Sequence, residues 1–148
     1  MGSILRDDER AELRRRLGTL TETSAARWGR MSVAAMVAHL VQSSRLALGE
    51  LPVASKNMRI FQVFPVKQLI LYVIPFPKGA MTAQELLVAS PQPFDAGRSE
   101  LLALLERLAA GPQEGPGPEH PLFGPLSRQE WGALMHKHLD HHLRQFGA

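Results

Sequence analysis

The sequence predicts an all-α protein: a four-helix bundle with a long crossover between its second and third helices. Two observations support this fold class. Apolar residues recur at helical spacing in four separate segments, and a proline-rich stretch lies between the second segment and the third. A chain of 148 residues also has the length of one domain, so we expect residues 1–148 to share a single core.

The first two predicted helices have clear apolar patterns. The first ends before Thr21, and its apolar stripe consists of leucines spaced four and three residues apart: Leu13, Leu17 and Leu20. The second begins with Ser32 as its N-cap and runs to about Leu48. Between residues 33 and 41 its only polar side chain is His39. An almost wholly apolar helix is expected in the interior of a bundle.

The segment 49–92 is divided into short pieces by five prolines and is interpreted as the crossover. Within it, residues 66–74 fit either a helix or a strand by periodicity, and Pro65 favours a helix because proline suits a first turn. A third long helix follows, with Asp95 as its expected cap and Gly111 as its stop. Its apolar stripe is formed by four leucines: Leu101, Leu104, Leu105 and Leu108.

The end of the chain is predicted to be a loop followed by a helix. Residues 111–125 are rich in glycine and proline, so we expect a loop, and this loop carries His120. Ser127 and Glu130 have the spacing of a capping box. They predict a last helix over residues 128–146.

Composition excludes several classes of function. The chain has no cysteine, which excludes disulfides, zinc fingers and a protein thiol nucleophile and is compatible with a reducing cytoplasm. Residues 6–16 are too highly charged for a signal peptide, so a cytoplasmic location is expected. A net charge of +3, with arginines interspersed among acidic residues, argues against nucleic-acid binding.

The longest apolar run, residues 69–76, is far shorter than the roughly 20 residues of a membrane-spanning helix. No membrane span is predicted. The run could instead contact a partner or a membrane surface, but burial within the crossover is the better supported interpretation.

The histidines form the candidate site. Helical geometry places His138 and His142 on the face of the last helix that should be buried, one turn apart, while His136 should be exposed. His39 lies mid-helix in the second helix, where facing helices build metal sites. Three neutral imidazoles would leave coordination positions open for water or substrate. Three alternatives remain. His39 could be a hydrogen-bonded core histidine, and the histidines between residues 136 and 142 could lie on a solvent-exposed surface. His141 could also be a ligand in place of His142.

Two motifs resemble the DinB/YfiT-like superfamily of four-helix metalloproteins. They are "WGRMSVAAMVAHL" at residues 28–40 and "HLDHHLRQ" at residues 138–145, which follows that superfamily's His, three residues, His, two residues, Gln pattern. The segments "HPLFGPLSRQEWG" and "KHLDHHLRQFG" are similar to one bacterial branch of it. The resemblance implies a divalent ion, zinc or nickel, held by His39, His138 and His142. In some relatives the ion activates a low-molecular-weight thiol such as bacillithiol, mycothiol or glutathione.

The sequence therefore supports a divalent-metal-binding protein, either a transferase or hydrolase that activates an external thiol or water, or a non-catalytic metal-binding or interaction protein. Its partner would be a small-molecule substrate or thiol, and formation of a homodimer is left open. His120 is the candidate general acid or base, although loop histidines are more often simply exposed. Gln42 and Gln145 are candidates for orienting ligands or substrate. Three imidazoles suit zinc, nickel, copper and iron alike.

Overall fold

The computed structural model describes residues 2–148 except 53, 57 and 80–86. Its elements follow one another in this order: α1 (Asp7–Thr19), α2 (Val33–Ala47), the 3₁₀ turn η1 (Arg59–Gln62), α3 (Val66–Gln68), the π-helical turn η2 (Leu69–Val73), α4 (Phe94–Ala110), β1 (Pro116–His120), β2 (Gly124–Ser127) and α5 (Arg128–Gln145).

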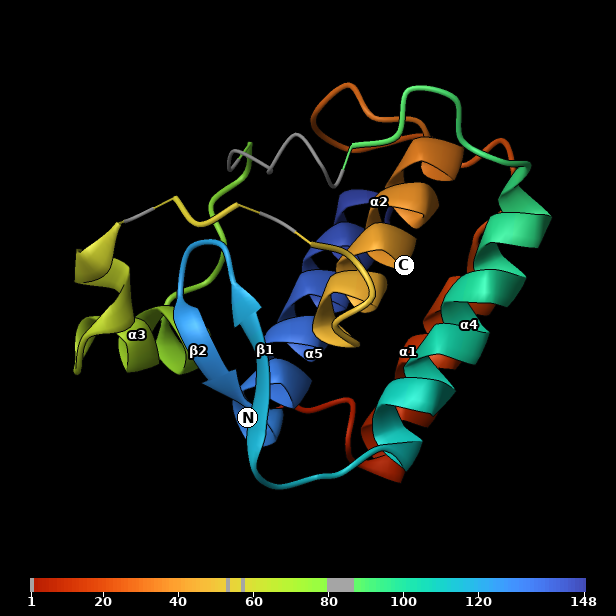
Figure 1. The fold of residues 1–148 in the computed structure, drawn as a ribbon. Coiled ribbons are helices and arrows are strands. Elements are labelled where there is room, and N and C mark those ends of the chain that lie inside the picture. The colour runs from red at the N-terminus through yellow and green to blue at the C-terminus, as the bar shows by residue number, and fades with distance from the viewer. Residues whose placement is uncertain (1, 53, 57, 80–86) are drawn as a thin grey trace.

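The prediction of an all-α four-helix bundle is wrong. Over the described residues the protein has five α-helices together with a two-stranded antiparallel sheet. The four long helices α1, α4, α2 and α5 contact one another in that order around a shared core. Figure 1 shows α1 and α4 on one side of this arrangement, with the β1–β2 hairpin and α3 on the other.

Local sequence signals account for the starts of two long helices. The Ser32 side chain accepts a hydrogen bond from the backbone N–H of Ala35, which confirms the predicted N-cap of α2. Ser127 and Glu130 form the predicted capping box at the start of α5. The prediction for α4 was less accurate, because the helix begins one residue before Asp95, which lies in the first turn and pairs with Arg98.

The core lies between the long helices and uses the predicted leucine stripes. All the leucines that were assigned to the first and third long helices are at least 92% buried: Leu13, Leu17, Leu20, Leu101, Leu104, Leu105 and Leu108. The end of α4 at Gly111 is also confirmed. In the ranges that the structure describes, no helix has both the length and the apolar character needed to cross a bilayer.

Residues 66–73 are helical, as Pro65 suggested, but they form three residues of α-helix followed by a π-helical turn. The expected burial of the 69–76 run is correct for Leu71, which is fully buried. It is wrong for Leu69, Val73 and Ile74, which are 42–68% exposed. This short helical segment projects from the bundle and buries only one side.

Residues 111–125 were predicted to be a loop, and this is wrong because they contain β1 and the start of β2. Prolines are tolerated here because each strand of a two-stranded sheet has a free edge. Tertiary contacts hold the hairpin against α5: the indole N–H of Trp131 donates to the Pro118 carbonyl at 2.8 Å. Gly117 lies so close that a Cβ there would be 2.6 Å from the Trp131 ring. Such contacts between distant residues leave no periodic signal in the sequence.

Candidate metal centre

Two facing helices bring His39, His138 and His142 together. His39 lies at the middle of α2 and is 99% buried, while His138 and His142 lie one turn apart on the buried side of α5. One ring nitrogen from each of the three lies within 4.8 Å of the others, so the three residues could hold a metal ion. The predicted position of the i, i+4 pair opposite His39 is therefore confirmed.

The three Nε2 atoms converge on one point. His138 Nε2 lies 2.9 Å from His39 Nε2 and 3.2 Å from His142 Nε2. Nitrogens bound at about 2.0–2.1 Å to one tetrahedral ion would be roughly 3.3 Å apart. Small rotations of the rings would reach that geometry. A tetrahedral ion held by three imidazoles keeps one position for water or substrate.

Gln145 fixes the orientation of His142. The Nδ1–H of His142 donates to Gln145 Oε1 at 2.7 Å, and Gln145 Nε2 donates in turn to the Trp28 carbonyl at 3.0 Å. An amide oxygen can only accept, so the proton of the neutral imidazole is on Nδ1 and the lone pair is on Nε2. This is the arrangement that a metal-binding histidine needs. Gln145 thus lies where the sequence suggested that an orienting residue would be.

The surroundings of the site keep the imidazoles of His138 and His142 neutral. Burial lowers the pKa of His138 well below the usual 6.5, and the neighbouring His39 and His142 lower it further. Burial and His39 lower the pKa of His142 to about 4, against the opposing effect of its hydrogen bond to Gln145. Neutral imidazoles at neutral pH are the form that binds metal ions.

His141 was the sequence-based rival of His142, and it lies outside the group of three. Its ring centroid is 5.2 Å from that of His142, and it packs edge-on against Trp28 at 5.9 Å and Phe76 at 6.0 Å. Phe76 also contacts the ring of His138 at 6.2 Å. Trp28 and Phe76 therefore form an aromatic rim beside the histidines.

Sequence reasoning did not assign this rim to the site. Trp28 belongs to one of the two motifs noted above, which was a usable signal, whereas Phe76 lies in the proline-rich crossover and gave none. Two cations lie over the rim: Lys78 Nζ is 4.6 Å from the centre of the Trp28 ring, and Lys137 Nζ is 4.7 Å from that of Phe76. The surroundings of the site are therefore aromatic and positively charged.

His120 ends strand β1, and its role as a general acid or base stays a prediction. Its Nδ1 accepts hydrogen bonds from the backbone N–H groups of Leu122 and Phe123, at 3.0 and 3.2 Å, and so braces the hairpin turn. Its ring packs against Phe123 and Trp131, with centroids 4.9 and 5.5 Å apart. Burial lowers its pKa to about 4. Only Nε2, which carries the proton, remains available to act on another group.

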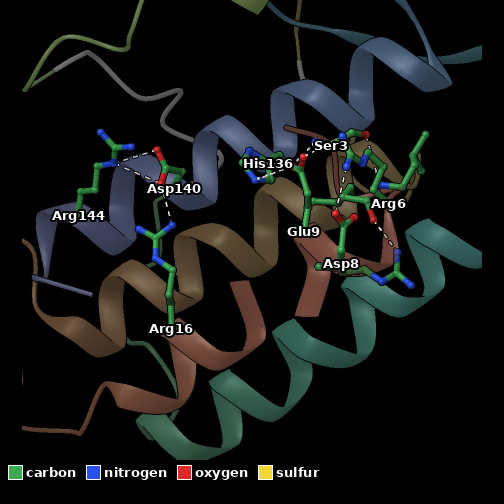
Figure 2. Close-up of polar contacts among 11 residues, drawn as sticks. Ser3, Arg6, Asp8, Glu9, Arg16, His136, Asp140 and Arg144 are labelled. Atoms are coloured by element: carbon green, nitrogen blue, oxygen red, sulfur yellow. Dashed lines mark hydrogen bonds and ion pairs between the residues drawn. The ribbon is translucent and has the colours of Figure 1, made fainter. Parts of the chain in front are cut away.

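The remaining residues singled out in the sequence are His136 and Gln42. His136 was expected to be exposed, but its side chain is only 23% exposed, because its Nε2 lies 3.0 Å from a Glu9 carboxylate oxygen that also accepts the Ser3 backbone N–H. Figure 2 shows this contact, which joins α5 to α1. Gln42 is partly buried one turn after His39 on α2, and its role in orienting a ligand stays a prediction.

The fold and the site define a helical protein, with a small β-hairpin, in which three histidines could hold a metal ion. The chain belongs to the family described as protein of unknown function (DUF1569), whose model matches residues 4–148. Searches of curated proteins and of solved structures gave no significant match to this chain.

Proposed function

We propose that the chain binds a divalent metal ion, zinc or nickel, through His39, His138 and His142, and that it is a metal-dependent transferase that activates a low-molecular-weight thiol or water. The convergence of the three Nε2 atoms carries this proposal. If all three Nε2 atoms carry lone pairs, as that of His142 does, they are unfavourable so close together without a proton or a cation between them. A divalent ion satisfies all three at once.

The ligand set favours an anionic fourth ligand. All three ligands are neutral imidazoles, so the full double charge of an ion would remain uncompensated by them. Such an ion lowers the pKa of a bound thiol or water and makes a nucleophile at neutral pH. Because the chain has no cysteine, a thiol would have to come from outside. The positive charge of Lys78 beside Trp28 would add to the attraction for an anion.

The aromatic rim gives the substrate a place to bind. The rings of Trp28 and Phe76 both contact His141 and are only partly buried, so they can contact the apolar part of a small molecule whose anionic end reaches the histidines. Thiol chemistry also draws on the resemblance to the DinB/YfiT-like superfamily, which remains a prediction. A reducing cytoplasmic location is part of the same proposal.

Metal analysis combined with thermal unfolding tests the metal site. Protein purified without a metal-affinity tag should contain zinc or nickel, and a chelator should remove it. Restoring the metal at about a thousand times its dissociation constant should stabilise the folded state by about 4 kcal/mol, or on the order of 10 °C in melting temperature. His39→Ala, His138→Ala and His142→Ala should each abolish this response.

His141→Ala is the matched control, because this residue is on the same helix and in contact with His142 but outside the group of three. It should keep the metal response. Loss of the response in His141→Ala to the same extent as in His142→Ala, or no effect of metal on the wild type, would refute the site. Thiol-transfer and hydrolysis assays on the metal-loaded protein then test catalysis: metal binding without turnover would leave a non-catalytic metal-binding protein.

A further inference from the structure

The crossover exposes an apolar surface that the bundle does not use. Six large apolar side chains between residues 60 and 74 are 42–81% exposed, and we call them the crossover patch: Ile60, Val63, Phe64, Leu69, Val73 and Ile74. They lie on η1 and η2 and in the residues directly after these two turns, and α3 contacts both turns. Figure 1 shows this segment projecting on the side of the molecule away from α1 and α4. A concentration of exposed apolar side chains marks an interaction surface.

The charge of the same segment is entirely positive. No Asp or Glu occurs between Glu50 and Glu85, whereas residues 51–84 contain four basic side chains. Lys67 forms an ion pair with Glu130 at 3.1 Å, so its charge is compensated. The other three basic residues are exposed: Lys56, Arg59 and Lys78. The exposed cations Lys56 and Arg59 therefore directly precede the exposed apolar residues in the chain, whereas Lys78 lies over the Trp28 ring beside the histidines.

Charge complementarity selects the occupant of this surface. In a twofold-symmetric pair of chains, each patch would face its own copy and bring like charges together, which is unfavourable. An anionic lipid surface instead offers negative charge to the basic side chains and an apolar layer to the exposed rings and aliphatic groups. Phe64, at 81% exposure, is the side chain best placed to insert.

We propose that the crossover patch docks the protein peripherally on a membrane surface that contains anionic phospholipid. The apolar and basic contributions are both needed, because a few exposed side chains of one kind bind membranes only weakly. The proposal does not depend on a metal ion at the histidines. It also requires no membrane-spanning segment.

Vesicle flotation with the full chain tests the proposal. The wild type should float with vesicles of phosphatidylcholine and phosphatidylglycerol, bind much less to phosphatidylcholine alone, and dissociate as salt is raised. Phe64→Ser or Val73→Ser should weaken binding about tenfold, and Lys56→Glu or Arg59→Glu at least about fivefold. These side chains are exposed, so the melting temperatures of the variants should match that of the wild type.

Two variants serve as matched controls. Leu87→Ser replaces an apolar side chain that is 44% exposed outside the patch, and Arg15→Glu reverses a charge on α1, whose side chain is 64% exposed. Both should bind vesicles as the wild type does. Absence of vesicle binding, or equal losses in the controls and the patch variants, overturns the proposal. So does a concentration-dependent dimer in sedimentation that Phe64→Ser dissociates, because the patch would then be covered by a second copy.

Discussion

The environment of His120 makes the stability of the protein depend on pH, and the effect can be isolated by one substitution. In the folded state burial lowers the pKa of this imidazole to about 4 from an ordinary value of 6.5. Between these two values the unfolded chain binds more protons than the folded one. The free energy of unfolding therefore falls as the pH falls through this window.

The size of the effect follows from the two pKa values. A difference of one pKa unit corresponds to about 1.4 kcal/mol, so the full contribution below both values is about 3 kcal/mol. Between about pH 7 and about pH 5 the wild type should lose about 2 kcal/mol through this residue alone. Protonation would also place a hydrogen on Nδ1 against the backbone N–H groups of Leu122 and Phe123.

The test is the substitution His120→Asn. Asparagine cannot titrate, and its side-chain oxygen can take the place of Nδ1 as acceptor for the two turn amides. The variant will have a lower absolute stability because the ring contacts with Phe123 and Trp131 are lost. Its unfolding free energy, measured by urea denaturation with chelator present, should nevertheless fall by about 2 kcal/mol less than that of the wild type over the same pH range. Parallel pH profiles for the two proteins would refute the reasoning.

Two further predictions concern single contacts. Gln145→Leu removes the acceptor for His142 Nδ1–H and should weaken zinc affinity, measured by calorimetry, by about 10- to 100-fold, the usual effect of removing a hydrogen-bond partner of a metal ligand. Gln145→Glu keeps an acceptor and should retain the affinity. Equal affinities of the Leu variant and the wild type would contradict the orienting role. Gly117→Ala places a Cβ 2.6 Å from the Trp131 ring and 2.9 Å from the Leu126 carbonyl oxygen, and should destabilise the protein by about 1–3 kcal/mol in urea denaturation. Its control, Gly18→Ala, has open space in a helix and should stabilise by about 0.5–1 kcal/mol; a loss of similar size in both variants would count against the packing argument.

The long helices were predictable because their signals are local and periodic. The leucine stripes of α1 and α4 specify a buried side, and the Ser32 cap and the Ser127–Glu130 box mark where α2 and α5 begin. The same geometry predicted the cluster of His39 with His138 and His142, since residues one turn apart on a buried helical side must face a neighbouring helix. Neither inference needed knowledge of a distant contact.

The hairpin and the exposed crossover could not be predicted in this way, because they depend on contacts between residues far apart in the chain. Nothing in a glycine- and proline-rich stretch indicates that Trp131 will bind the Pro118 carbonyl and hold a strand in place. Likewise, the apolar run at residues 69–76 has the composition of a core, and only the path of the chain leaves Val73 and Ile74 in solvent. Such an exception to apolar burial is the reason for proposing a second interaction surface besides the histidine site, since exposed clusters of apolar side chains commonly mark interaction surfaces.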